Sequence, residues 1–191
     1  DAGILLGGVL GGAISSTATT VSYSRQARND PWATTAVAVV VMIASTISCL
    51  RVLVAVSIVA PAFLTRLALP VLVLAALTLV PSLALWWRQR SRPGQMPPSE
   101  NPTELKSAII FGVIYAGVIV ALAATQFYFG SRGLYAVAGL SGFTEMDAIT
   151  LSTARLSNVD PMVAADGWRL IVVAIMSNMV AKTAIAVAAE I

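Results

Sequence analysis

Six long apolar segments alternate with short polar segments along the chain. They cover residues 2–24, 33–60, 66–87, 106–128, 133–155 and 167–189. Each provides the roughly 20 residues that a helix needs to cross about 30 Å of hydrocarbon. Because backbone inside a bilayer must satisfy its own hydrogen bonds, the pattern predicts an all-α polytopic membrane protein with about six transmembrane helices, some of which can be broken.

Composition supports a membrane protein and narrows its chemistry. Charged residues make up 11% of the chain and apolar residues 58%, whereas about a quarter of an ordinary soluble domain is charged. The net charge of +3 is small and most of the basic residues lie in connectors, so no nucleic-acid surface is expected. Histidine is absent and Cys49 is the single cysteine, which excludes an intrachain disulfide and a cysteine metal site. We find no nucleophile–base pair or phosphate loop, and therefore expect neither an enzyme nor a cofactor.

The basic residues orient the expected bundle. In the six-helix arrangement, only Arg66 and Arg132 of the connector residues fall on one side, whereas Arg51 and Lys182 lie within helices. A bias of this kind marks the more basic side as cytoplasmic, and both ends of the chain then face outward. The chain begins at Asp1 and enters an apolar segment at once, which we read as a processed chain or a fragment and not as a signal peptide. The cytoplasmic group consists of Arg25, Arg28, Arg88, Arg90, Arg92, Lys106, Arg155 and Arg169.

The two ends of the chain are similar in sequence, which indicates an internal repeat. Residues 11–31 (GGAISSTATTVSYSRQARNDP) align with 141–161 (SGFTEMDAITLSTARLSNVDP), and a slip of one residue extends the match to Arg51 and Lys182. Within a single domain 1–191, the copies cover about 3–60 and 133–191, with linking helices 66–87 and 106–128 and a cytoplasmic loop 88–105. Four spans separate the two starts, so we expect a parallel repeat unless one span is re-entrant. Identical pairs include Gly12/Gly142, Ala18/Ala148, Thr20/Thr150, Ser22/Ser152, Arg25/Arg155, Asp30/Asp160 and Pro31/Pro161.

The repeated stretch is unusually polar for a membrane helix. Residues 15–22 contain six hydroxyl side chains, and the second copy places Glu145 and Asp147 in the same region. If the second helix breaks near Gly142, both acids lie in the first turn of a new half-helix, where the helix dipole favours them. Two interpretations stay open: the two stretches face a shared polar site, or they are cytoplasmic helix ends in water. The glycines before them are expected to form helix-packing seams, which also allow a homo-oligomer.

Two cations lie within apolar segments. Lys182 is about 21 Å from the cytoplasmic start of its helix at 1.5 Å per residue, so we expect a partner for it, either Asp147 or Glu145. Arg51 either snorkels to the outer headgroups or joins the same site. Glu145 and Asp147 are the candidate metal ligands. The full set of candidate ion-binding residues is Ser15, Ser16, Thr19, Thr20, Arg51, Glu145, Asp147, Thr150, Asn178 and Lys182.

Several stretches carry a family resemblance in their order along the chain. They are GILLGGVLGGAISSTATTVSYSRQARNDP, LRVLV with PAFLTRLALP, NPTELKSAIIFG, and GLYAVAGLSGFTEMDAITLSTARL. Together they resemble the C-terminal membrane domain of MgtC/SapB-type bacterial and archaeal proteins. The resemblance implies a multi-pass protein of the cell membrane, and the family's association with magnesium limitation implies Mg²⁺ or another divalent cation as cargo. It supplies no catalytic residues.

Three functions remain open from the sequence. The chain is a transporter or channel-like protein for a small ion, a transporter for a small anion, or a non-transporting scaffold or regulatory subunit. Carboxylate and hydroxyl oxygens suit Mg²⁺, but a neighbouring Lys182 makes a poor cation cage. The expected partners are the lipid bilayer, a small ion or solute, and further copies of the chain.

Overall fold

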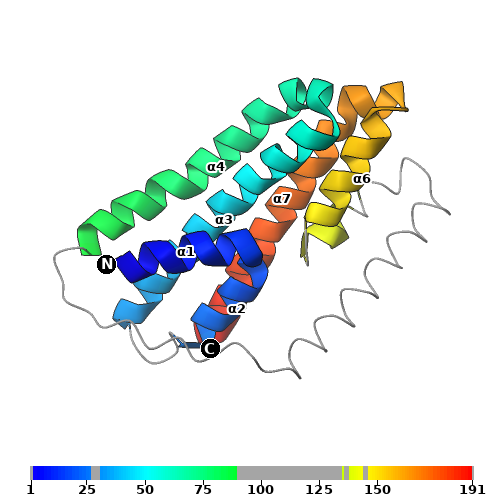
Figure 1. Cartoon of the computed structure of the whole chain (residues 1–191). Coiled ribbons are helices and arrows are strands. Elements are labelled where there is room, and N and C mark those ends of the chain that lie inside the picture. The colour runs from blue at the N-terminus through cyan, green and yellow to red at the C-terminus, as the bar shows by residue number, and fades with distance from the viewer. Residues whose placement is uncertain (1, 27–30, 90–134, 136–137, 144–145, 191) are drawn as a thin grey trace. The chain divides into compact units, whose positions relative to one another are not determined.

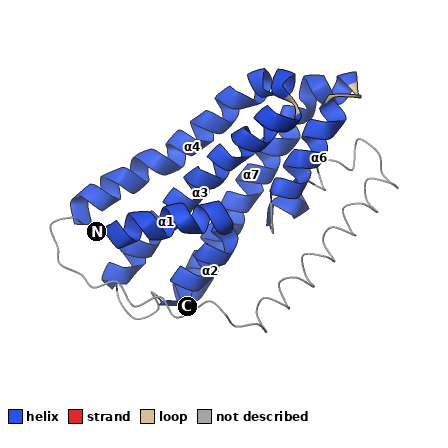
Figure 2. Ribbon diagram, viewed as in Figure 1, coloured by secondary structure: helices blue, strands red, loops and turns tan. Residues whose placement is uncertain are grey.

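A computed structural model describes residues 2–26, 31–89, 135, 138–143 and 146–190, and every element within these ranges is an α-helix (Figures 1 and 2). This confirms the all-helical class for the described part of the chain. The helices are α1 (Ala2–Ile14), α2 (Ser16–Gln26), α3 (Pro31–Val59), α4 (Pro61–Gln89), α6 (Asp147–Ser157) and α7 (Pro161–Glu190).

Three of these helices are long and apolar enough to cross a membrane. The candidate spans are Thr34–Val59, Pro61–Arg88 and Pro161–Ala188. They match the expected segments 33–60, 66–87 and 167–189, and they indicate that the chain associates with a membrane. The expected segment 106–128 lies outside the described residues, as do most of the connector 88–105 and part of the segment 133–155.

Proline begins each of the three long helices, at Pro31, Pro61 and Pro161. Proline suits the first helical position because its missing N–H has no partner there in any case. Asp160 caps α7, since its Oδ1 accepts the N–H of Met162 at 2.8 Å. Two connectors are shorter than the sequence predicted. Residues 61–65 belong to α4, which begins at Pro61, and only residues 158–160 separate α6 from α7.

The chain divides into two compact units. Unit 1 comprises Asp1–Val54, Leu67–Pro98 and Lys182–Ile191, and unit 2 comprises Ala55–Arg66 and Ser99–Ala181. In unit 1 an apolar cluster joins α1 to α3 through Ile4, Val40 and Ile43, with Tyr23 of α2 packed against it. This cluster anchors the N-terminal helices on α3.

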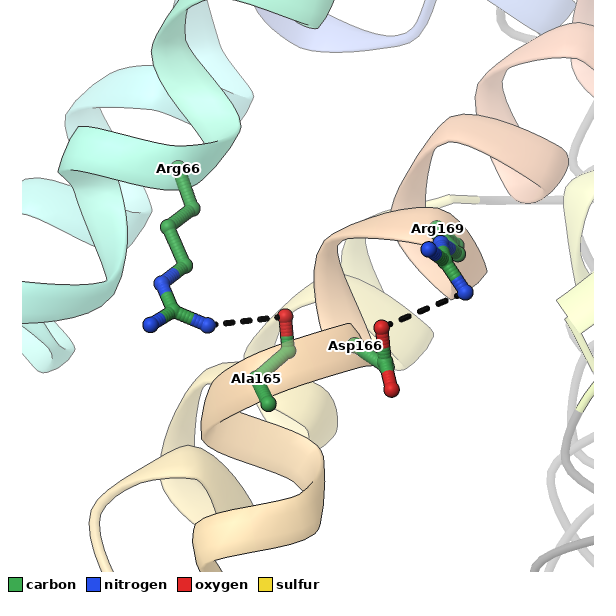
Figure 3. Close-up of polar contacts among 4 residues, drawn as sticks. All are labelled: Arg66, Ala165, Asp166 and Arg169. Carbon is green, nitrogen blue, oxygen red and sulfur yellow. Dashed lines mark hydrogen bonds and ion pairs between the residues drawn. The ribbon is translucent and has the colours of Figure 1, made fainter.

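Unit 2 brings the α3–α4 connection next to the α6–α7 connection. The side-chain amide of Asn158 donates to the carbonyl oxygen of Val59 at 3.0 Å. The guanidinium of Arg66 donates to the carbonyl oxygen of Ala165 at 3.1 Å, one turn from Arg169 (Figure 3). The sequence placed Arg66 on the opposite side of the membrane from Arg155 and Arg169. That assignment is wrong, because these connections lie at one end of unit 2.

The same contacts place the ends of two helices. Within unit 2, the last residues of α3 and the first residues of α7 lie at this end. The expected parallel repeat stays a prediction.

Candidate functional site

The first helix is interrupted in the middle of its polar stretch. The α1 helix ends at Ile14 and α2 begins at Ser16, and the direction changes between them (Figure 1). Ser15 caps the second piece, because its Oγ accepts the N–H of Ala18 at 3.3 Å. The expected continuous span 2–24 is thus two helices of 13 and 11 residues. Neither is long enough to cross hydrocarbon alone.

Arg51 of α3 binds the exposed end of α1. Its Nη1 lies 3.5, 3.1 and 3.3 Å from the carbonyl oxygens of Gly12, Ala13 and Ile14. The last carbonyls of a helix have no partner within the helix, and a cation there also interacts favourably with the helix dipole. Arg51 thus joins α3 to the end of α1 at the interruption.

Glycine lets α1 approach the backbone of α3 at this level. A Cβ added to Gly12 would lie 2.6 Å from the carbonyl oxygen and 2.8 Å from the Cα of Ala44. A Cβ added to Gly8 would lie 2.7 Å from Ile43. These positions are the packing seam that the sequence predicted, with α3 as its partner.

The hydroxyl side chains of α2 bind to their own helix. Thr19 Oγ1 donates to the carbonyl oxygen of Ser15, and Thr20 Oγ1 donates to that of Ser16, both at 2.8 Å. Ser16, Thr19 and Thr20 are buried. Back-bonding of this kind explains how a membrane helix accommodates many hydroxyl groups at low cost.

Several polar side chains make separate contacts along the middle of α3 in unit 1. The ammonium of Lys182 donates to Ser45 Oγ at 3.2 Å, and only 2% of Lys182 is exposed. Thr46 Oγ1 and Thr78 Oγ1 of α4 share a hydrogen bond of 2.8 Å. The sequence missed Ser45 and Thr78, although a hydroxyl in each apolar run was the available signal. We call these polar side chains on and against α3, which make separate contacts, the α3 polar cluster: Ser45, Thr46, Ser48, Arg51, Thr78 and Lys182.

A second interruption lies in unit 2. Residues 138–143 are helical, Met146 lies in a bend and α6 starts at Asp147, which confirms Asp147 in the first turn of a new helix. Asn178 Nδ2 donates to the carbonyl oxygen of Gly142 at 2.8 Å. Thr150 Oγ1 donates to the carbonyl oxygen of Met146 at 2.8 Å. Residues 144 and 145 lie outside the described ranges, so the structure does not describe the candidate ligand Glu145.

Two expectations stay open at this level. The pairing of Lys182 with Asp147 or Glu145 remains a prediction. Within the described ranges, no three Asp, Glu, His or Cys side chains lie together so that they could hold a metal ion, while one of the two expected metal ligands lies outside those ranges.

Comparisons with known proteins find a family of unknown function and an uncharacterized relative. The family described as "Domain of unknown function (DUF4010)" matches residues 1–189. An "Uncharacterized protein" of Aquifex aeolicus (strain VF5) is 30% identical over 189 residues, covering 96% of this chain and 81% of that protein. No solved structure matches the chain.

Proposed function

The chain belongs to the DUF4010 family, and from this premise we propose that it is a multi-pass transporter of a small solute, with its site at the interrupted helix of unit 1. The observation that carries the proposal is the break between α1 and α2, closed by Arg51 on three backbone carbonyls. Non-helical backbone at membrane depth is tolerated only where protein surrounds it or where it lines a cavity.

The arrangement of helices supports a transporter over a channel or an enzyme. Many secondary transporters consist of inverted repeats whose discontinuous helices form the substrate site near the bilayer midplane. This chain has two interruptions, at Ser15 and at Met146, and a long helix follows each of them, α3 and α7. We propose that the two segments are copies of one repeated element. The six-span count and the cell-membrane location with a cytoplasmic loop 88–105 belong to the same proposal.

Fixed charge favours a small anion as the solute. The sequences of α1, α2, α3 and α4 contain no Asp or Glu, whereas Arg51 and Lys182 bring positive charge to the α3 polar cluster. A divalent cation would need oxygen ligands, commonly carboxylates, in place of those positive groups. Cations within a membrane segment commonly mark an ion or substrate pathway.

Divalent-cation transport is the second candidate. It follows from the resemblance to MgtC/SapB-type proteins, and one observation favours it: Asp147 begins α6 directly after the second interruption. A cation site there would lie in unit 2 and would depend on Asp147 and Glu145, independently of Arg51.

A non-transporting scaffold is the remaining alternative. Gly8 and Gly12 pack against α3, and hydroxyl groups that bind their own helix need no solute. If this reading holds, the interruption is a fixed bend of a structural protein and no small ion stabilises it.

The experiment is flux through the purified protein reconstituted in liposomes. We would measure uptake of chloride, sulfate, phosphate and acetate as sodium salts, and uptake of Mg²⁺ as the gluconate salt. The proposal expects saturable uptake of at least one small anion and none of Mg²⁺. Uptake of Mg²⁺ alone would move the assignment to the second candidate. If no ion is taken up and no ion shifts the melting temperature, the non-transporting scaffold is the remaining assignment.

A further inference from the structure

The α1 helix runs beside the first half of α3 and in the same direction. A Cβ added to Gly8 would lie 3.2 Å from the carbonyl oxygen of Val40. A Cβ added to Gly12 would lie 2.6 Å from the carbonyl oxygen of Ala44. The contact therefore advances by one helical turn on α3 for each helical turn on α1, as it does only between helices that run parallel.

These contacts set the depth of α1 relative to α3. The candidate span of α3 is Thr34–Val59. Ala44 is ten residues from its start, about 15 Å at 1.5 Å per residue, and the hydrocarbon core is about 30 Å thick. With α3 across the membrane, Gly12 thus lies near the bilayer midplane. The same pairing, continued back along α1, sets Ala2 level with Thr34, where the span begins.

After Ser15 the chain turns back along α1. A Cβ added to Gly11 would lie 2.6 Å from Thr19 Cγ2, and one added to Gly7 would lie 2.6 Å from Tyr23 Oη. In one continuous helix Gly7 and Tyr23 would be about 24 Å apart, which is far beyond the reach of a tyrosine side chain. The α2 helix therefore returns toward the start of α1, and Figure 1 shows the sharp angle between the two.

The returning helix ends near the start of α3. Tyr23 packs against Val37, in the second turn of α3. The α2 helix ends at Gln26 and α3 begins at Pro31. The four residues between them reach at most about 17 Å when fully extended, which is too short to cross about 30 Å of hydrocarbon. Gln26 and Pro31 therefore lie on the same side of the membrane.

Two of these packing contacts recur in unit 2. A Cβ added to Gly142 would meet the carbonyl oxygen of Ala174, and one added to Gly167 would lie 2.9 Å from Thr153 Cγ2. Both pairs come 130 residues after a pair in unit 1, without a slip in register, and those pairs are Gly12 with Ala44 and Tyr23 with Val37. The packing of the broken segment on the long helix that follows it is therefore a feature of both copies.

We propose that α1 and α2 form a re-entrant hairpin, which enters and leaves the membrane on the side where α3 begins and turns at Ser15 near the bilayer midplane. The first of the six apolar segments then inserts without crossing, so the hairpin replaces one of the six proposed crossings. Ala2 lies on the same side as Arg25, whereas the sequence predicted opposite sides. A turn at this depth is tolerated because α3 and Arg51 supply its contacts.

The test is the side from which single cysteines react with a membrane-impermeant maleimide. Ala2→Cys and Gln26→Cys mark the two ends of the hairpin, and Ala62→Cys marks an exposed position just beyond the opposite end of α3. Each variant is labelled in spheroplasts and in inverted membrane vesicles. Wild type, whose Cys49 is buried, gives the background. An unchanged melting temperature in detergent confirms the fold of each variant, and Gly3→Cys, at an exposed position of α1, repeats the measurement for Ala2.

We expect Ala2→Cys and Gln26→Cys to label about tenfold or more strongly in one preparation, and Ala62→Cys in the other, since the reagent does not cross the hydrocarbon core. Ala2→Cys that labels together with Ala62→Cys, and opposite to Gln26→Cys, would overturn the inference, because residues 2–26 would then cross the membrane. All three labelling from one side would also overturn it, because α3 would then not cross. Protection of a folded Ala2→Cys and Gly3→Cys from both sides would do so as well, because the hairpin would then not begin at the membrane surface. None of these results depends on transport, so the proposed function keeps its own test.

Discussion

At the interruptions of unit 1 and unit 2, backbone carbonyl oxygens need hydrogen-bond donors from outside their helix, and the two units supply different donors. Each interruption follows a glycine packed against the backbone of a long helix, and each is followed by a threonine that bonds four residues back. They differ in the group that closes the helix end, a guanidinium in unit 1 and an amide in unit 2. The common part belongs to the architecture, and the part that differs is where a specific function can reside.

The largest expected effect tests the common part. Gly12→Ala and Gly142→Ala should each destabilise the protein by about 1–3 kcal/mol, because the new Cβ meets helix backbone that cannot move aside easily. Thermal or denaturant unfolding in detergent measures the loss. Gly139→Ala is the matched control, since its Cβ has only Ser177 Oγ nearby, at 3.8 Å. A tolerant Gly12 beside a sensitive Gly142 would break the equivalence of the two units.

Replacing the side chains that bind the helix ends, Arg51 and Asn178, should give the next largest losses of stability, and the two losses should differ. Arg51→Ala removes a charged donor from three carbonyls and is expected to cost about 2–3 kcal/mol, whereas Asn178→Ala removes one neutral bond and should cost about 1–2 kcal/mol. Unfolding of the two variants under the same conditions compares them. Equal losses would mean that the extra contacts of Arg51 contribute nothing.

A contact present in only one unit gives a smaller effect. Thr46 and Thr78 share an interhelical hydrogen bond in unit 1, while position 176, the counterpart of Thr46, is a methionine that is 53% exposed. A double-mutant cycle with Thr46→Val and Thr78→Val should give a coupling of about 0.6 kcal/mol. Met176→Leu serves as the control and should leave stability unchanged. Strictly additive losses would mean that Thr46 and Thr78 do not stabilise one another, and the contact would then not distinguish the two units.

The smallest expected effect is also the most symmetrical. Thr20→Val and Thr150→Val each delete a 2.8 Å bond to a carbonyl four residues earlier. Because the carbonyl of Met146 also accepts the backbone N–H of residue 150, the loss there should stay near 0.5 kcal/mol. Unfolding of both variants and of the matching Thr→Ser controls should show the same small values in both units.

The sequence predicted the elements that repeat and the class of the fold. Gly12 with Gly142 and Thr20 with Thr150 could be paired because identical residues at one spacing are visible in the chain. The break at Ser15 was not placed in advance, since hydropathy is the same whether a polar stretch continues a helix or divides it. The side of the membrane assigned to Arg66 depended on the number of crossings between residues 66 and 155, and hydropathy alone does not say whether each apolar segment there crosses the membrane completely.

Other parts of the site depend on distances that no spacing in sequence encodes. Arg51 lies 37 to 39 residues from the carbonyls it binds, and an arginine in an apolar run has many possible acceptors. The slip that paired Arg51 with Lys182 matched residues by charge, whereas the packing of Gly12 and Gly142 follows the backbone. The packing contacts therefore gave the more reliable register.

The single residue between α3 and α4 has a consequence for how the protein is made. Ala60 alone joins two helices of 29 residues each, so this hairpin offers almost no hydrophilic chain for the insertion machinery to carry across the bilayer. The two helices are expected to leave the ribosome and enter the lipid as a pair. A short hydrophilic tag inserted at Ala60 should slow this step, which cell-free insertion with a timed protease challenge would measure.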